Sequence, residues 1–428
     1  MKYIMDILLS IDLLMVISTF ISAKYYVKYS NKMNAMSMQN GTNDKVFVLL
    51  PAFKEQILVS ETLDYFSKMD TPNCKIIVIT SEQEEHENKC RGKKIKTTKE
   101  CVEEYLNKNS ESNIVHLHGN YVNGTKSTQL NFALEKIKEL LPENAYCTSY
   151  VGVYDFDSRP NLDVLGDLQK IAYHQKYPEI VQQVPINLKN FTSLTRNKNH
   201  IMMLHCCQSM IRSVGIELAS LILHAKGLFV PLYCMGAGMY IRLDALLENG
   251  AFPEPVDDLT LGYRLYLKGK RFALLPKYNS VEIPNSVKEL VKQDTGIFKG
   301  VCSGLLELKQ KSKLVRKIPT YFIVWHNILL RTAIPWMYLL YVCINLLLMN
   351  INLEIILILI LPLLRTIAGA YSLAKADQNI SRLLISKEGV RVFIDSYSWR
   401  LLRTVGPLNV MFSNYRLHRM KEFKNKSY

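Results

Sequence analysis

Long apolar runs lie at both ends of this chain, whereas short apolar runs are spaced through its middle. The first long run covers residues 7–23, and two more, 332–349 and 355–374, are separated by a short polar turn. A helix of about 20 apolar residues crosses the hydrocarbon core of a bilayer. The pattern therefore predicts a globular domain between membrane-associated segments, with an N-terminal anchor helix at 1–30 and a transmembrane hairpin within 319–375.

The middle of the chain has the pattern of an α/β domain, which we place at 45–310. Runs rich in β-branched residues alternate there with amphipathic stretches of helical length. The first four of these runs cover 46–50, 75–80, 113–117 and 149–154. Strands separated by helices favour a mostly parallel sheet flanked by helices.

Local signals refine this pattern. Thr97 followed by Glu100 predicts a capping box at a helix start. The polar stretch 81–91 has no apolar periodicity, and we predict a solvated loop there. His116 and His118 alternate on one face of a strand run without a nearby carboxylate, so we expect no metal site at that position.

Charged residues qualify the membrane-associated segments. Asp12 interrupts the first apolar run, and a charge at the centre of a transmembrane helix costs about 2.5–3.5 kcal/mol, so a helix lying in the interface is the alternative to a span. Arg365 interrupts the third run. The turn 350–354 lacks Lys and Arg, so we expect it to face away from the cytoplasm. The segment 319–331 and the basic tail 376–428 are expected to lie along the membrane.

The chain carries a formal net charge of +15, which suits nucleic acid, an anionic membrane surface or a nucleotide substrate. Its basic residues gather in 24–32, 311–317 and 416–426, beside apolar runs, which favours membrane lipids as partners and argues against nucleic acid. The nine cysteines are odd in number and include no C-x-x-C pair, so they indicate neither a disulfide framework nor a zinc site. We expect an integral protein of the plasma or inner membrane with its catalytic domain in the cytosol.

Two carboxylates follow the fourth predicted strand. Asp155 and Asp157 lie one residue apart at its end, within Tyr150-Val-Gly-Val-Tyr-Asp155-Phe-Asp157. The carboxyl ends of strands are where α/β folds bind ligands, and two such side chains can reach a hard cation that bridges phosphates. A solvated turn after the strand is the alternative.

A second acidic pair, Asp257 and Asp258, opens a predicted helix that bears a leucine stripe. Carboxylates in the first turn stabilise a helix without any catalytic role. Capping and catalysis therefore both remain open for this pair on local grounds.

Five motifs in one order change this balance. They are Pro51-Ala-Phe-Lys-Glu55, then Gly124-Thr-Lys126-Ser-Thr-Gln-Leu130-Asn131-Phe-Ala133, the D-F-D segment, Gly236-Ala-Gly238 with Arg242, and Asp257-Asp258, with Glu282-Ile-Pro284 following. In this order they resemble the family 2 glycosyltransferases, over about residues 45–300. The resemblance implies a GT-A nucleotide-sugar-binding fold and an enzyme that transfers a sugar from a nucleotide sugar, with a UDP-sugar as the expected donor.

The resemblance also implies a role for each matching residue on the donor side. Pro51 and Glu55 would help to hold the nucleotide, and Lys126 and Asn131 would touch phosphate or base, although capping or packing is the alternative for Asn131. Asp155 would contact the nucleotide. Mg²⁺ or Mn²⁺ would be held by Asp157 together with Asp155.

On the acceptor side, the resemblance implies that Asp258 is the catalytic base and that Asp257 replaces the family's glutamate beside it. Attack opposite the leaving group implies inversion at the anomeric carbon. Gly236, Gly238, Arg264 and Gln293 would lie near the acceptor, and a structural ion pair is the alternative for Arg264.

The sequence departs from the family at two places. Processive members, such as synthases of cellulose, chitin and hyaluronan, carry Q-x-x-R-W, but here Gln293 is followed by Gly296 and Ile297 at the Arg and Trp positions. The aspartate expected after the second strand is replaced in Thr80-Ser-Glu82. We therefore favour single transfer to a lipid-linked or glycan acceptor. A processive synthase with a diverged acceptor motif, and a non-catalytic nucleotide-sugar-binding membrane protein, are the alternatives.

Overall fold

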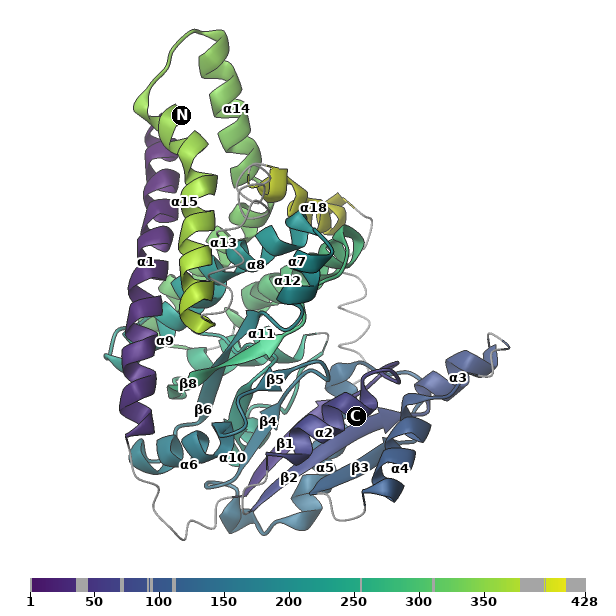
Figure 1. Ribbon diagram of the computed structural model, residues 1–428. Coiled ribbons are helices and arrows are strands. Elements are labelled where there is room, and N and C mark those ends of the chain that lie inside the picture. Colours follow the sequence, from purple (N-terminus) through teal and green to yellow (C-terminus); the bar gives the residue numbers. More distant parts are fainter. Residues whose placement is uncertain are drawn as a thin grey trace.

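A computed structural model of the protein describes residues 2–35, 45–69, 73–90, 92, 95–109, 113–254, 256–309, 312–377, 396 and 398–412. In these residues the strands form one curled sheet with the order β3-β2-β1-β4-β7-β6-β8-β5 (Figure 1). The strands are β1 (Val46–Pro51), β2 (Cys74–Ser81), β3 (Ile114–Gly119), β4 (Tyr150–Val153), β5 (Arg159–Pro160), β6 (Ile180–Asn187), β7 (Met239–Arg242) and β8 (Phe272–Val281). The four predicted strand runs are confirmed as β1 to β4.

The sheet is mixed rather than uniformly parallel. Strands β1 to β4 run parallel as expected, and β6 pairs parallel with β8. Strand β7 lies antiparallel between β4 and β6, and β5 lies antiparallel to β8. Because Met239 pairs with Val153, β7 starts where β4 ends. The loop that leads into β7 therefore lies at the carboxyl edge of β4.

Helices cover both faces of the sheet, and this explains the continuous apolar runs of its strands. Alternate β1 residues enter different cores, with Phe47 and Leu49 on one face and Val48 and Leu50 on the other. The first core includes residues of α5 (Lys126–Leu140), α8 (His200–Arg212) and α11 (Asp257–Leu267), and the second includes α2 (Val59–Ser67), α4 (Thr98–Lys108) and α6 (Val164–His174).

The prediction of a solvated loop at 81–91 was wrong, because α3 (Gln83–Cys90) forms there. Its Glu84 is buried and accepts a hydrogen bond from the backbone N–H of Thr98, at the start of α4. A long-range contact of this kind leaves no periodic signal in the sequence. The predicted capping box of Thr97 and Glu100 is confirmed at the same helix.

The remaining described helices connect and cover the sheet. They are the 3₁₀ helix η1 (Glu143–Ala145), α7 (Phe191–Arg196), the π-helical turn η2 (Ser213–Leu218), α9 (Ala219–Ala225), α10 (Leu243–Glu248), α12 (Val287–Glu307), α13 (Leu314–Thr332) and α18 (Val405–Phe412).

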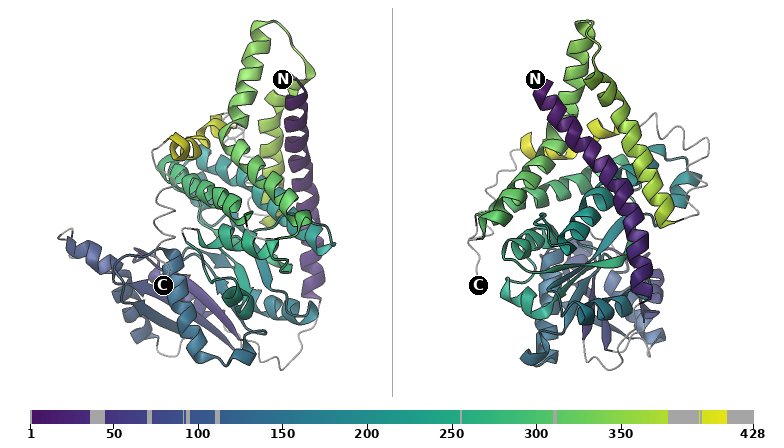
Figure 2. Two further views of the ribbon diagram at one scale, coloured as in Figure 1. Left: turned by 180° about the vertical axis from the view of Figure 1, so that it is seen from behind. Right: turned by 90° about the vertical axis from the view of Figure 1, so that its left-hand side faces the viewer.

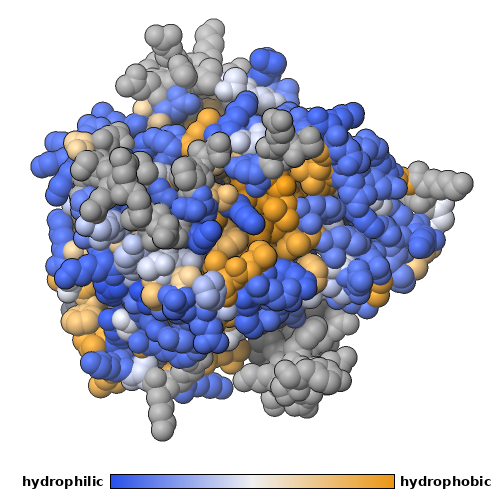
Figure 3. All heavy atoms as spheres, turned by 90° about the horizontal axis from the view of Figure 1, so that it is seen from below, coloured by the Kyte–Doolittle hydropathy of each residue, from blue (hydrophilic) through white to orange (hydrophobic). Residues whose placement is uncertain are grey.

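Three helices extend beyond the α/β part at one end of the molecule: α1 (Lys2–Asn34), α14 (Ile334–Leu347) and α15 (Leu353–Ala376) (Figures 1 and 2). Among the described residues, Lys2–Met33, His200–Ala225 and Leu353–Ala376 are long and apolar enough to cross a membrane, and the pair α13 and α14, bent by 56°, is a fourth candidate. The Met-rich start of the second of these segments is largely buried. Seen from the opposite end, the surface is mostly hydrophilic, with a hydrophobic band across its middle (Figure 3).

The charges inside the apolar runs are paired with one another. The Asp12 carboxylate lies 2.7 Å from Arg365 Nη1 and 2.9 Å from Arg400 Nη2, and it accepts a hydrogen bond from Tyr338. At the other end of α1, the Tyr26 ring stacks on Tyr278 of β8 with centroids 3.8 Å apart. Helix α1 is therefore joined to the membrane-candidate helices at one end and to the sheet at the other.

Candidate functional site

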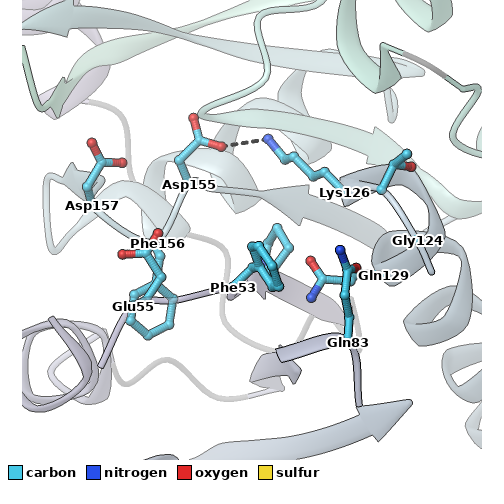
Figure 4. Close-up of a pocket in the computed structure, with 11 residues that line it drawn as sticks. Phe53, Glu55, Gln83, Gly124, Lys126, Gln129, Asp155, Phe156 and Asp157 are labelled. Atoms are coloured by element: carbon cyan, nitrogen blue, oxygen red, sulfur yellow. Dashed lines mark hydrogen bonds and ion pairs between the residues drawn. The ribbon is translucent and has the colours of Figure 1, made fainter. Parts of the chain in front are cut away.

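Two cavities meet at the carboxyl edge of β1 and β4, and three side chains line both: Lys126, Asp155 and Asp157. The first cavity has a volume of about 500 Å³ and the second about 480 Å³. Figure 4 shows the first cavity. It is lined by Pro51, Phe53, Glu55, Gln83, Gly124, Thr125, Lys126, Gln129, Asp155, Phe156 and Asp157.

The end of β4 positions the two aspartates. Tyr154, the residue before Asp155, is buried and hydrogen-bonds Gln183 and Tyr240 beneath the site, which fixes the backbone. Asp155 then points toward Lys126, while Asp157 lies on the Glu55 side of the cavity (Figure 4). Asp157 Oδ2 also accepts a hydrogen bond from the backbone N–H of Glu282, at 3.2 Å.

Lys126 joins the two acidic pairs. It is the first residue of α5, whose N-cap Thr125 accepts a hydrogen bond from the Thr128 backbone N–H. Its Nζ lies 2.6 Å from Asp155 Oδ1 and 3.7 Å from Asp257 Oδ2. Burial lowers the pKa of Lys126, but these carboxylates outweigh burial and hold its pKa above the usual range. A permanent cation thus sits at a helix N-terminus, an arrangement suited to phosphate.

The carboxylates around this cation repel one another. Burial, with the charges of Asp157 and Asp155, raises the pKa of Glu55 to about 7. Burial and the charge of Asp155 raise the pKa of Asp157 to about 6. Negative charge is therefore crowded here, and a divalent cation would relieve it.

The metal-ligating side chains at this site suit a cation whose other ligands come from a bound substrate. Within the described residues no group of three or more His, Cys, Asp or Glu side chains is arranged to hold a metal alone. Mg²⁺ is commonly held by one or two carboxylates, with water and substrate phosphates as its other ligands. Asp155 and Asp157 fit that pattern.

The second cavity contains the other acidic pair, Asp257 and Asp258, at the first turn of α11. Asp258 Oδ2 accepts a hydrogen bond from the Gly236 N–H at 2.8 Å, and Oδ1 accepts one from the Leu259 N–H at 2.6 Å. Burial and the charge of Asp257 raise the pKa of Asp258. Its carboxylate is thus oriented by two backbone donors and binds a proton more readily than an exposed aspartate.

Close backbone packing explains two glycines near Asp258. A Cβ at Gly236 would lie 2.8 Å from Asp258 Oδ2, and a Cβ at Gly262 would lie 1.9 Å from the backbone nitrogen of Cys234. Any larger residue at position 262 would push α11 away from the loop that contains Cys234 and leads into β7. Position 236 must stay small for its N–H to reach the carboxylate.

The structure brings some predicted acceptor-side residues to the site and leaves others out. Gly236 and Gln293 line the second cavity, and so do Gly296 and Ile297, which occupy the other two positions compared with Q-x-x-R-W. Gly238, with φ +92°, lines neither cavity and turns the chain beside Gln182, which donates a hydrogen bond to its carbonyl.

Arg264 is a correction to the acceptor-side set. It pairs with Glu307 of α12 at 3.0 Å and donates to the Asn249 carbonyl, and it lines neither cavity. Six residues after Asp258 in a helix of 3.6 residues per turn, it points about 120° away from that side chain. The structural ion pair is therefore what forms.

Asn131 likewise has a structural partner. Its side chain donates to the Phe252 carbonyl at 2.9 Å and accepts from the Phe252 N–H at 3.0 Å. Both amide atoms are thus used in joining α5 to the loop before α11, and Asn131 does not line the first cavity.

Sequence reasoning missed several lining residues. In the first cavity these are Phe53, Gln83 and Gln129; in the second they are Arg212, Arg331, Arg365, Trp399, Arg400 and Arg403. A charged residue inside an apolar run is a reason to expect a functional site, so Arg365 could have been predicted from the sequence to line one. Trp399 and its neighbours belong to the segment expected to be a membrane-associated tail.

The His116 and His118 side chains share the Thr80 hydroxyl, at 2.8 and 2.9 Å. Burial lowers the pKa of His116 to about 4, so its ring is neutral. These rings are accounted for by packing and hydrogen bonding within the β2–β3 pair.

Neither a protein-family model nor a curated protein matches the chain. Among solved structures, it is similar to the mannosyltransferase PcManGT from Pyrobaculum calidifontis in complex with GDP-Man and Mn²⁺, with 14% identity and a TM-score of 0.49 over 94% of this chain and 99% of that one. It is also similar to S. aureus TarS, with 14% identity, a TM-score of 0.43 and coverage of 86% and 55%. For TarS 1-349 in complex with UDP the values are 16%, 0.41, 87% and 93%. At these identities and scores, neither a family nor an activity follows from the likeness.

Proposed function

We propose that this chain is an inverting glycosyltransferase that moves a sugar from a nucleotide sugar, a UDP-sugar in the first instance, to a hydroxyl of a lipid-linked or glycan acceptor. One observation carries the proposal. A cavity with a phosphate-type site and a second cavity with an oriented carboxylate, Asp258, meet at Lys126, Asp155 and Asp157.

The donor would occupy the first cavity, whose volume is in the range of small-molecule sites. Its phosphates would lie at Lys126 and the N-terminus of α5, and Pro51 and Glu55 would face the nucleotide. Asp155 and Asp157 would hold Mg²⁺ or Mn²⁺, which when bound supplies positive charge to the departing nucleoside diphosphate.

The acceptor would enter from the second cavity. As the acceptor oxygen bonds to the anomeric carbon, the bond from that carbon to the diphosphate oxygen breaks, and the hydroxyl proton passes to Asp258. Burial and the charge of Asp257 keep the Asp258 pKa raised, which favours proton uptake. Attack from the side opposite the diphosphate inverts the anomeric configuration.

A membrane location is part of the proposal. Three candidate spans, together with basic segments beside the apolar runs, support an integral protein with its α/β domain on the cytosolic side. The second cavity is lined by residues of two of these candidate spans, His200–Ala225 and Leu353–Ala376, which gives a membrane-bound acceptor a direct way into it.

A processive synthase remains the second candidate because of one feature of the second cavity. The three positions compared with Q-x-x-R-W line it, and Trp399 supplies an aromatic side chain from another segment. Product length separates the two functions, since a ladder of long products indicates processivity and a single addition indicates transfer.

The test of the proposal is release of nucleoside diphosphate by the full chain purified in detergent. UDP-, GDP- and TDP-sugars are offered with Mn²⁺ or Mg²⁺ and then with EDTA, and total membrane lipid serves as acceptor. Cation-dependent release of one nucleoside diphosphate is expected. If folded protein neither binds nor cleaves any donor in the panel, the glycosyltransferase proposal fails; if it binds a donor with cation but never cleaves it, the non-catalytic alternative stands.

A further inference from the structure

The second cavity has ends of opposite charge. Near the first cavity it is lined by Lys126 and by five carboxylates, which are Asp155, Asp157, Asp257, Asp258 and Glu282. The group of five arginines that also lines it, called the basic end here, is Arg212, Arg331, Arg365, Arg400 and Arg403, of which Arg212 also interacts with Asp258. A divalent cation suits the first end, and the second end suits an anion.

The arginines outnumber the carboxylates that pair with them. Arg331 and Arg403 share Asp294, and Arg365 and Arg400 share Asp12. Arg212 pairs with Glu217 at 2.8 Å. Five guanidinium groups thus form ion pairs with three carboxylates, which leaves two positive charges more than negative ones within this set of ion pairs.

Three polar atoms beside these arginines have no hydrogen-bond partner among the described residues. They are Arg403 Nε, Trp399 Nε1 and His205 Nδ1, and all three residues line the second cavity. His205 Nε2 lies 3.2 Å from the amide nitrogen of Asn187, which can only donate, so Nδ1 carries the proton. His205 and Trp399 are 2% and 6% exposed. Buried donors normally have acceptors, and a group with several oxygens would provide them.

The walls of the basic end come from membrane-candidate helices. Arg212 lies in the His200–Ala225 segment, Arg331 in the bent pair α13 and α14, and Arg365 in α15. Apolar side chains continue the lining there, namely Ile211, Ile216, Leu330 and Pro335. An anion at this end would therefore be attached to a molecule with a hydrocarbon part.

We propose that the acceptor is a lipid that carries a phosphate group and a hydroxyl, with the phosphate held by Arg331, Arg403 and the donors of Trp399 and His205. This inference rests on the proposed glycosyltransferase function. The hydroxyl then lies toward Asp258 in the same cavity. Two excess charges match a phosphate group, and guanidinium forks pair with its oxygens.

Lipid binding tests the proposal. The full chain in neutral detergent is titrated with phosphatidic acid, with diacylglycerol of the same acyl chains, and with glycerol 3-phosphate, and binding is followed by native mass spectrometry. Phosphatidic acid has the phosphate group and the acyl chains but no free alcohol, so it probes the phosphate site alone. Phosphatidic acid is expected to bind at least about tenfold more tightly than either of the other two compounds. A single hydrogen bond to a charged group is enough to change a Kd by about that factor. Equal binding of diacylglycerol would overturn the phosphate site, and equal binding of glycerol 3-phosphate would overturn the lipid assignment.

Single variants localise the effect. Arg331→Gln and Arg403→Gln should each weaken binding of phosphatidic acid about tenfold or more, and in each variant the other arginine still pairs with Asp294. Arg403→Lys keeps the positive charge but loses the two-pronged guanidinium group, so it should weaken binding of phosphatidic acid less than Arg403→Gln does. It takes the place of Arg403→Gln in the test if that variant does not fold. The control is Arg271→Gln, because Arg271 pairs with Glu179 at 3.1 Å and lines neither cavity. Unchanged binding in both cavity variants would refute the site.

Nucleotide binding is measured on the same variants. UDP binding with Mn²⁺ should be unchanged, which separates the lipid site from the donor site. If wild-type protein binds phosphatidic acid through these arginines but binds no nucleotide sugar, the phosphate site is upheld and its assignment to an acceptor is overturned along with the proposed function.

Discussion

Replacing Asp258 with asparagine removes the proposed base while keeping the shape of the side chain. The carboxylate accepts hydrogen bonds from the N–H groups of Gly236 and Leu259 at 2.8 and 2.6 Å. Asparagine has one acceptor oxygen, so it can keep only one of these bonds. Loss of the other costs about 1 kcal/mol. Because burial and Asp257 disfavour the charged carboxylate, neutralising it offsets part of that loss.

The catalytic effect should be much larger than the effect on stability. A positioned general base contributes about 10²–10⁴-fold to a reaction, which corresponds to about 2.7–5.4 kcal/mol of barrier. Since Asp258 lines the second cavity and not the first, donor binding should be nearly unaffected. The expected result is therefore a large fall in kcat with a donor Kd within about threefold.

The assay compares wild-type protein with Asp258→Asn and with the control Asp244→Asn. Asp244 pairs with Arg242 at 2.7 Å and lines neither cavity. Transfer to lipid is measured under single turnover, and donor Kd is measured with Mn²⁺ present. A loss of kcat below about tenfold in folded Asp258→Asn would rule out general-base catalysis by this residue.

Three further predictions concern the cation, the pH dependence and the buried ion pairs. Asp157→Asn should remove the stimulation of donor binding by Mn²⁺, measured by titration with and without EDTA; stimulation equal to wild type would contradict its role as a ligand. Because the pKa of Asp258 is raised and a base must be ionised, kcat should fall on acidification at a pH above the ~4 of an exposed aspartate. Asp257→Asn should shift this fall of kcat to lower pH, and an unshifted pH profile would show that the charge of Asp257 does not raise the pKa of Asp258. Asp12→Asn leaves two buried guanidiniums without a counter-charge and should lower the free energy of unfolding by about 3–5 kcal/mol, seen as a lower midpoint in detergent; an unchanged midpoint would show that the cluster is solvated.

The strands of the first half of the sheet could be predicted because a strand that is buried on both faces is apolar at consecutive positions, as in β1 and β2. The direction of β7 could not be predicted. The sequence of its four residues, Met239–Arg242, does not show whether the strand runs parallel or antiparallel to its neighbours. That direction is set by the point at which the preceding loop enters the sheet. Helix α3 was missed because its one buried carboxylate, Glu84, is held by a partner on another helix.

At the site, the aspartates could be predicted because each pair is local in sequence and ends or begins an element. Their environment could not be predicted in the same way. The carboxylate of Asp258 is oriented by Gly236, and Lys126 reaches both acidic pairs, only because the fold brings separate segments together. Arg264 shows the opposite error, since a position near a motif in sequence can face away from it on the helix.

Asp12 shows how the membrane-candidate helices take part in the site. On the sequence alone this charge weakens the case for a span, because an isolated carboxylate in an apolar helix is costly. In the fold it pairs with Arg365 and Arg400, and both of these arginines also line the second cavity. Helix α1 therefore holds two of the cavity's basic side chains in place, while its other end stacks on β8 through Tyr26. Helix α1, the basic end of the cavity and the sheet that carries the aspartates are thus parts of one structure, and the proposed acceptor site depends on all three.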